Sequence, residues 1–207
     1  MFAAIGAFFL KWFLRLRAFA MIAGAWGVLF SVITIIGFKV GFEYDDGLVF
    51  STPAFKTAAA GARHTALAGS LSADAVVADA DYWNAVNRAY KLEHIKPIPW
   101  MTAWFFKVFG FKVEIFCARG EEGSDSLQNS WRMLADYFHF TADENKKYEL
   151  LERSRFIFYF TPSDEGVIQA KKADVTPIRI HKNKRSLNAC LYNPGKFGER
   201  ALPLSEF

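Results

Sequence analysis

The sequence predicts an α/β domain, built as a parallel sheet with helices on both faces, behind a single N-terminal transmembrane helix. Two observations lead to this prediction. The run from Ala18 to Phe38 holds no charged residue and lies close to the start of the 207-residue chain. Beyond it, short apolar runs typical of strands alternate with amphipathic segments typical of helices, which is the order of a parallel sheet. About 170 residues remain after such an anchor, which suits one domain with a single core.

The N-terminal run is long enough to cross a bilayer, because about 20 helical residues at 1.5 Å each span a hydrocarbon core of ~30 Å. We therefore divide the chain into an anchor at residues 1–37, with its helix at about 18–37, and a domain at residues 38–207. Lys11, Arg15 and Arg17 precede the run, and acidic residues follow soon after it. The positive-inside rule then predicts a cytoplasmic N-terminus and a domain on the outer side, which in a bacterium is the periplasm.

Two other interpretations of this segment stay open. A cleaved signal peptide would end at the small residues Ala23, Gly24 and Ala25, although the apolar run continues well beyond them and favours an uncleaved anchor. Alternatively, residues 32–36 form a buried strand of the domain, and the helix is then shorter. The apolar and aromatic segment 1–16 is also compatible with an amphipathic helix at the membrane interface.

The composition excludes one class of partner. A net charge of +4, from 25 Lys and Arg against 21 Asp and Glu, is too small to indicate a nucleic-acid-binding protein. The two cysteines, Cys117 and Cys190, fit no metal-binding spacing. They are either two buried thiols, which we favour, or one disulfide in an oxidising compartment.

Apolar runs bounded by turn residues predict four strands, and amphipathic spacing predicts the helices between them. In such a sheet, functional groups gather at the carboxyl ends of the strands. The sequence shows no Gly-x-Gly-x-x-Gly, no P-loop and no internal repeat. The strands are predicted at residues 38–44, 111–117, 155–160 and 177–180, the helices at 81–90, 100–109, 126–138, 146–153 and 166–173, and a loosely packed Ala-rich excursion at 58–80.

Charged residues follow two of these strands. Glu43, Asp45 and Asp46 follow the first strand, and Asp164 follows the third. Lys147 stands in the first turn of a later helix. Carboxylates bind hard cations such as Mg²⁺ through oxygen, and a lysine offsets phosphate charge, so this set is typical of magnesium-assisted phosphoryl transfer.

Residues 38–207 resemble the haloacid dehalogenase (HAD) superfamily, and within it the class B acid phosphatases. The resemblance implies a HAD-like Rossmannoid sheet and hydrolysis of phosphate monoesters with Mg²⁺ by an aspartate nucleophile. The residues that match, in chain order, are 41–46 (Gly-Phe-Glu-Tyr-Asp-Asp), 50–55 (Phe-Ser-Thr-Pro-Ala-Phe), 81–83, 134–139, 163–164, 178–180, 197–199 and 205–207.

The resemblance also assigns roles to single residues. Asp45 falls at the position of the general acid/base, whose backbone carbonyl helps to hold Mg²⁺. Lys147 falls at the phosphate-binding lysine and Arg119 at a nearby arginine, and Phe55 lines the substrate pocket. Asp164 is a retained acidic residue of the fourth motif, so Glu43, Asp45 and Asp164 form the implied, weakened metal set.

Several positions depart from the family pattern. Glu43 replaces the nucleophilic aspartate, and its extra methylene moves the carboxylate by ~1.5 Å. A misplacement of about 1 Å can lower a rate by on the order of 10²-fold. Pro162 stands at a magnesium-binding aspartate, and Gly47 and Gly166 stand at a threonine and a further aspartate. The phosphate-binding threonine falls at residues 117–118, Cys and Ala, neither of which has a hydroxyl group.

These departures favour a membrane-anchored pseudoenzyme without Mg²⁺, acting as a binding or assembly subunit of a membrane complex. The alternative is an active magnesium-dependent phosphomonoesterase, with Glu43 or Asp45 as nucleophile and a phosphate ester as substrate. A third hypothesis is an anchored homo-oligomer, because the related phosphatases assemble through C-terminal tails similar to this one.

Overall fold

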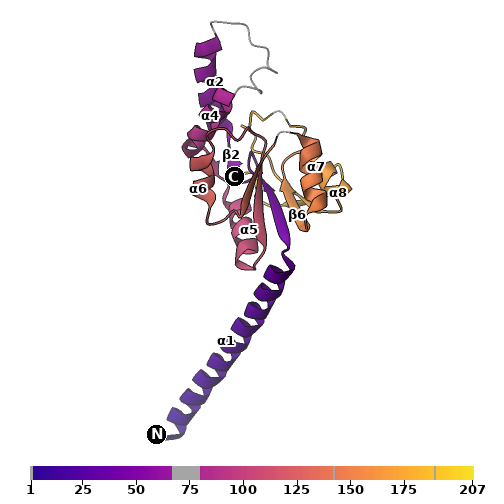
Figure 1. Cartoon of the computed structure of the whole chain (residues 1–207). Coiled ribbons are helices and arrows are strands. Elements are labelled where there is room, and N and C mark those ends of the chain that lie inside the picture. Colours follow the sequence, from indigo (N-terminus) through magenta and orange to yellow (C-terminus); the bar gives the residue numbers. More distant parts are fainter. Residues whose placement is uncertain (1, 67–79, 142, 189) are drawn as a thin grey trace.

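A long N-terminal helix and one α/β domain make up the computed structural model of the chain, which describes residues 2–66, 80–141, 143–188 and 190–207 (Figure 1). The elements are α1 (Phe2–Ile36), β1 (Lys39–Glu43), β2 (Val49–Phe50), α2 (Thr52–Ala66), α4 (Ala80–Arg88), η1 (Ala89–Leu92), β3 (His94–Ile95), α5 (Pro97–Val108), β4 (Lys112–Cys117), α6 (Asp125–Trp131), β5 (Tyr137–Phe140), α7 (Glu144–Arg153), β6 (Phe156–Thr161), α8 (Asp164–Lys172), β7 (Thr176–Ile180) and β8 (Arg200–Leu202).

The central sheet has six parallel strands in the order β5-β4-β1-β6-β7-β8. Strand β1 lies in its interior, and its central residues Val40, Gly41 and Phe42 are buried because both faces of the sheet are covered. On one face, Phe42 stacks on Phe160 with 4.3 Å between ring centroids, and α5 and α6 pack over them. On the other face, Leu151 of α7 and Ala170 of α8 pack against Tyr159. The predicted parallel α/β class, with helices on both faces, is confirmed.

Two local predictions within the domain were wrong, and three short strands were missed. The helix predicted at 126–138 is α6 followed by the edge strand β5, because aromatic residues at 137, 138 and 140 suit a strand and Asp136 accepts a hydrogen bond from the Val113 backbone. The first part of the Ala-rich excursion continues α2, and its residues 67–79 lie outside the described part of the chain. The short strands β2, β3 and β8 were not predicted.

Helix α1 continues to Ile36, so the interpretation of residues 32–36 as a strand is wrong. Residues Lys11–Ile36 are long and apolar enough to cross a membrane. They extend for about 39 Å at 1.5 Å per residue. Among the side chains described at 11–36, only Ile33 is buried. Gly37 ends the helix with a positive φ of 73°, a conformation that glycine adopts without steric cost.

The sheet is oriented with its amino edge toward α1. Lys39 opens β1 three residues after Ile36, where α1 ends, and Glu43 closes the strand at the opposite edge. Figure 1 shows α1 leaving the domain at one end and α2 and α4 at the other. The carboxyl ends of the strands, where functional groups gather in this architecture, therefore point away from α1.

Candidate functional site

Glu43 lies buried at the carboxyl end of β1 and already has partners. Its Oε1 accepts hydrogen bonds from Lys147 Nζ at 3.1 Å and from the Tyr159 hydroxyl at 3.0 Å. Lys147 reaches Glu43 from the first turn of α7, where Asp143 caps the helix by accepting a bond from the Asn145 backbone. The predicted partners Glu43 and Lys147 are thus brought together, as an internal ion pair.

A second carboxylate shares the same ammonium group. Lys147 Nζ donates to Glu144 Oε1 at 2.7 Å, one helical turn away. Burial by itself lowers the pKa of Lys147, but the charges of Glu43 and Glu144 outweigh it and raise that pKa above its ordinary value. Burial, and then the nearby Glu43 charge, also raise the pKa of Tyr159 well above its usual range. Beside Glu43, Lys147 is therefore charged and Tyr159 is neutral.

Asp45 is buried against Arg119, which follows β4. Arg119 Nε donates to Asp45 Oδ1 at 3.0 Å, and its Nη2 lies 2.5 Å from the same oxygen. Arg119 also pairs with Glu93, whose other oxygen accepts the Tyr44 hydroxyl at 2.5 Å. The guanidinium group lies 5.0 Å from the Tyr44 ring centroid and 5.1 Å from that of Phe55.

In this arrangement, the predicted substrate-binding residues Phe55 and Arg119 contact other protein side chains. Phe55 contacts the buried Arg119, and Arg119 is held by Asp45 and Glu93. Burial works to lower the pKa of Arg119, but the two carboxylates raise it above its ordinary value. Burial is also the largest cause of the raised pKa of Glu93. Arg119 Nη1 is a buried donor with no hydrogen-bond partner among the described residues.

Asp164 belongs to a separate group of interactions. It accepts bonds from Arg179 Nη2 at 2.9 Å and from the backbone and side-chain nitrogens of Asn193 at 2.8 and 2.7 Å. Burial works to raise the pKa of Asp164, but the bonds from Asn193 and the Arg179 charge lower it below its usual range. Arg179 also pairs with Glu199 at 2.8 Å. The structure does not bring Asp164 together with Glu43 and Asp45 in one site.

A small pocket opens at the end of β1. Its volume is about 70 Å³, well below the several hundred Å³ that ligand pockets commonly have. Neither Phe55, Arg119 nor Asp164 lines it. The lining residues are Glu43, Asp45, Phe116, Ala118, Glu144, Lys147, Ser163, Glu165, Asn188 and Cys190.

These residues do not fit the magnesium ion that the family resemblance implies. Mg²⁺ needs near-octahedral oxygen ligands. Within the described ranges, no three His, Cys, Asp or Glu side chains converge as a metal site. The oxygens of Glu43 and Asp45 that face inward accept bonds from Lys147 and Arg119, whose charges repel a cation.

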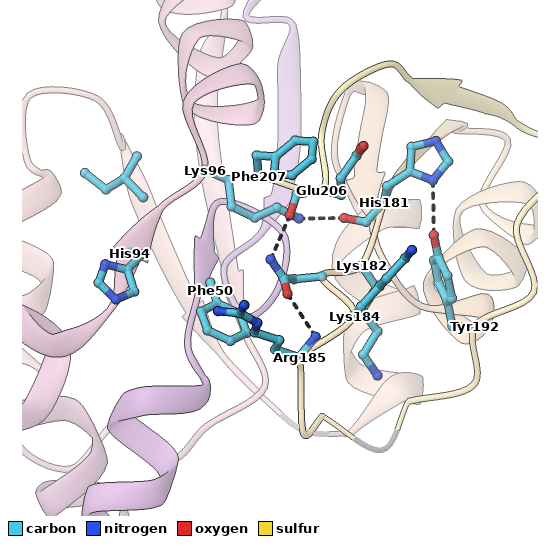
Figure 2. Close-up of a pocket in the computed structure, with 12 residues that line it drawn as sticks. Phe50, His94, Lys96, His181, Lys182, Lys184, Arg185, Tyr192, Glu206 and Phe207 are labelled. Atoms are coloured by element: carbon cyan, nitrogen blue, oxygen red, sulfur yellow. Dashed lines mark hydrogen bonds between the residues drawn. The ribbon is translucent and has the colours of Figure 1, made fainter.

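A larger pocket, of about 900 Å³, lies beside the segment that follows β7 (Figure 2). The buried Lys96 points into its base and donates to the backbone oxygens of Asp46 at 2.8 Å and His181 at 2.7 Å. Burial lowers the pKa of Lys96 to about 8. On the rim, Tyr192 bonds His181 at 3.1 Å. The pocket is rich in cations, since Lys182, Lys184 and Arg185 also line it.

Sequence reasoning missed four of these residues. Glu144 was detectable, because an acidic residue three positions before Lys147 on a helix lies beside it. Glu93, Tyr159 and Lys96 gave no local signal, because their partners lie far away in the chain.

The strand order, with helices on both faces of the parallel sheet, matches a haloacid dehalogenase-like α/β fold. The chain is similar to a candidate beta-phosphoglucomutase from Thermotoga maritima, with 17% identity, a TM-score of 0.52, and coverage of 79% of this chain and 93% of that one. It is also similar to CbbY from Rhodobacter sphaeroides in complex with phosphate, with 12% identity, a TM-score of 0.52, and coverage of 79% and 92%.

A dehalogenase gives a comparable result, with 13% identity, a TM-score of 0.50, and coverage of 81% of this chain and 93% of that one. No protein-family model matches the sequence, and no curated protein matches it. At these identities the similarity establishes the HAD-like fold alone, and the site has to be judged on its own residues.

Proposed function

We propose that this chain is a membrane-anchored homologue of the class B acid phosphatases whose catalytic centre is impaired, and that it acts as a binding or assembly subunit of a membrane complex. The observation that supports this most directly is the pairing of Glu43. The carboxylate at the nucleophile position accepts bonds from Lys147 and Tyr159. Both bonds end on Glu43 Oε1, and Lys147, the cation that would draw a phosphate toward a nucleophile, is already shared with Glu144.

The altered positions are also fixed by their surroundings. A Cβ atom at Gly47 would lie 1.9 Å from the backbone oxygen of Glu43, so a threonine there would require the turn to move. A Cβ atom at Gly166 would lie 2.2 Å from Thr161 Oγ1 and 2.9 Å from Glu43 Oε1. The space of the missing aspartate is therefore filled by neighbouring side chains, which supports a scaffold that has repacked around the loss.

The positions to which the family resemblance assigns metal binding give further support. Pro162 has no side-chain oxygen, and its backbone oxygen accepts a bond from Arg179 Nη1 at 2.9 Å. Asp164 is held by Arg179 and Asn193. Groups that hold Mg²⁺ in related enzymes instead form ion pairs that stabilise the fold here.

The placement in a membrane follows from α1. A helix whose described apolar side chains are nearly all exposed is unfavourable in water, since each buried side chain of this kind gains about 1.5–3 kcal/mol. We propose that α1 crosses the membrane once, with Lys11, Arg15 and Arg17 on the cytoplasmic side and residues 38–207 on the outer, periplasmic side.

An activity assay tests the impaired centre. The full chain is purified in detergent and incubated with para-nitrophenyl phosphate and Mg²⁺, with Glu43→Gln as the matched control. We expect the two proteins to release product at the same background rate. Turnover by the wild type that disappears in Glu43→Gln would establish the alternative, an active magnesium-dependent phosphomonoesterase.

A double variant tests whether the rest of the catalytic centre is still functional. Glu43→Asp with Pro162→Asp restores two acidic positions of the family pattern. We expect it to stay inactive, because Gly47 and Gly166 are unchanged and Lys147 remains paired with Glu144. Restored turnover would show that the scaffold still binds phosphate and metal.

The assembly role is tested by size. Light scattering in detergent gives the protein mass in the particle, to be compared with 23.4 kDa for one chain. We expect a larger mass from association of the chain with itself or with a membrane partner. A clean monomer, both from its native membrane and after overexpression, would remove this part of the proposal.

A further inference from the structure

The domain meets α1 through the end of α5. Gly110, two residues past α5, packs against α1 so closely that a Cβ atom there would lie 2.7 Å from Thr34 Oγ1 and 2.9 Å from the Phe30 backbone oxygen. Thr34 Oγ1 also donates to the Gly110 oxygen at 3.4 Å. Gly110 therefore lies level with residues that belong to the apolar span Lys11–Ile36.

Helix α5 carries an apolar face that nothing in the described chain covers. Met101, Phe105 and Val108 are 59%, 58% and 51% exposed, and their spacing of four and three residues places them on one side of the helix. Phe109 extends this face toward α1, with its ring centroid 4.6 Å from that of Phe105. Ala103, on the opposite side, is buried in the core. We call Met101, Phe105, Val108 and Phe109 the α5 face.

Cations lie at the same edge of the domain. Arg155 is exposed and donates from Nη1 to the backbone oxygen of Ile36 at 2.9 Å, which holds it at the end of the apolar span. Lys112 opens β4, which lies on the other side of β1 from β6 and Arg155, at the same amino edge of the sheet. It is exposed and, in the described ranges, has no carboxylate within ion-pair distance. An apolar patch bordered by unpaired cations is typical of a surface that lies in the lipid interface.

We propose that the α5 face inserts into the boundary between headgroups and acyl chains of the membrane that α1 crosses, with Lys112 and Arg155 on anionic headgroups. This rests on the proposed placement of α1 in a membrane. A linker of only two residues joins α1 to β1, and Gly110 is packed on α1, so the end of α5 cannot lie far from the bilayer surface. In Figure 1, α5 lies beside the end of α1, whereas α2 and α4 lie at the far end.

The consequence is a fixed orientation of the domain. With α1 and α5 both held by the bilayer, the domain has two attachments instead of one flexible stalk. The carboxyl edge of the sheet, with Glu43 and Asp45, then faces away from the membrane toward soluble partners. A partner that binds at this edge meets it at a constant height above the bilayer.

Depth-dependent fluorescence quenching tests the insertion. The full chain carries Cys190→Ser, so that the buried Cys117 is its remaining native thiol. One cysteine is then introduced as Phe105→Cys, Val108→Cys, Ile22→Cys or Leu187→Cys and labelled with an environment-sensitive dye. Ile22 reports the middle of α1, and Leu187, which is 62% exposed, reports the carboxyl side of the domain. The proteins are placed in phosphatidylcholine vesicles with or without phosphatidylglycerol and with doxyl-labelled lipid.

We expect the dyes at 105 and 108 to be quenched by doxyl lipid and shifted to the blue, the dye at 187 to stay water-exposed, and quenching at 105 to increase with phosphatidylglycerol. Quenching at 22 without quenching at 105 or 108 would overturn the insertion and leave the anchor intact. A dye at 105 shielded from water but not quenched by lipid would identify a protein on the α5 face and also overturn it. No quenching at 22 would overturn the anchor and the insertion together.

Discussion

Lys147 Nζ lies 3.1 Å from Glu43 Oε1 at the end of β1, and the same ammonium lies 2.7 Å from Glu144 Oε1. One buried cation thus serves two carboxylates, and one of them, Glu43, stands where the family resemblance implies a nucleophile. Removing one partner of a buried ion pair is costly, because it leaves the other charge buried without compensation.

Lys147→Met should therefore destabilise the protein by about 3–5 kcal/mol, since Glu43 loses its cation. Lys146→Met is the matched control, because Lys146 is the neighbouring lysine and is exposed. Unfolding of the full chain in detergent, followed by circular dichroism, measures both. Equal midpoints for the two variants would contradict the pairing.

Arg119→Lys should be destabilising although the charge is kept. The guanidinium group donates from two nitrogens to Asp45 and lies between the rings of Tyr44 and Phe55, which an ammonium group cannot reproduce. Losing one charge-assisted hydrogen bond costs about 1.5–3 kcal/mol. Arg132→Lys, at an exposed position, should change the unfolding free energy by less than about 0.5 kcal/mol. A similar small effect of both variants would refute the role of Arg119.

Lys96 should make stability depend on pH in the alkaline range. Burial lowers its pKa in the folded protein to about 8, against about 10.4 in the unfolded chain. Between these values the unfolded chain binds more protons, so stability rises with pH, by roughly 3 kcal/mol at most. The measurement is the unfolding free energy of wild type and Lys96→Met from pH 7 to above pH 10. Parallel pH profiles would show that Lys96 titrates normally.

Gly110→Ala should weaken the junction between α1 and the domain. Gly110 and Gly195 both have positive φ, 87° and 83°, but only Gly110 has neighbours within 4 Å of an added Cβ atom. Gly195→Ala thus measures the backbone strain alone, about 1–2 kcal/mol. Gly110→Ala should lower the free energy of unfolding by about 1–3 kcal/mol more than Gly195→Ala, because its new methyl group overpacks against Thr34 and Phe30. The thermal unfolding midpoints of the two variants test this prediction. An equal decrease in both midpoints would mean that the contact with α1 contributes nothing to stability.

The sequence was sufficient for four of the six strands of the sheet, β1, β4, β6 and β7, and for the helices α4, α5, α7 and α8. Residues 38–44 alternate and are bounded by Asp45, Asp46 and Gly47, and they form β1 at 39–43. The HAD-like fold followed from ordered matches in the chain. The helix predicted at 126–138 failed because its apolar spacing spans α6 and the edge strand β5, and pairing with β4 decides where one ends.

The pairing of charges between distant parts of the chain was decided by the tertiary structure. The sequence placed Glu43, Asp45 and Asp164 at strand ends, because local patterns determine where strands end. It could not show that Asp164 pairs with Arg179 and Asn193, because bonds between residues 15 and 29 positions apart depend on how α8, β7 and the following segment pack. Local chemistry therefore determined which residues reach the carboxyl edge of the sheet, and packing between distant segments determined which cation each of them meets.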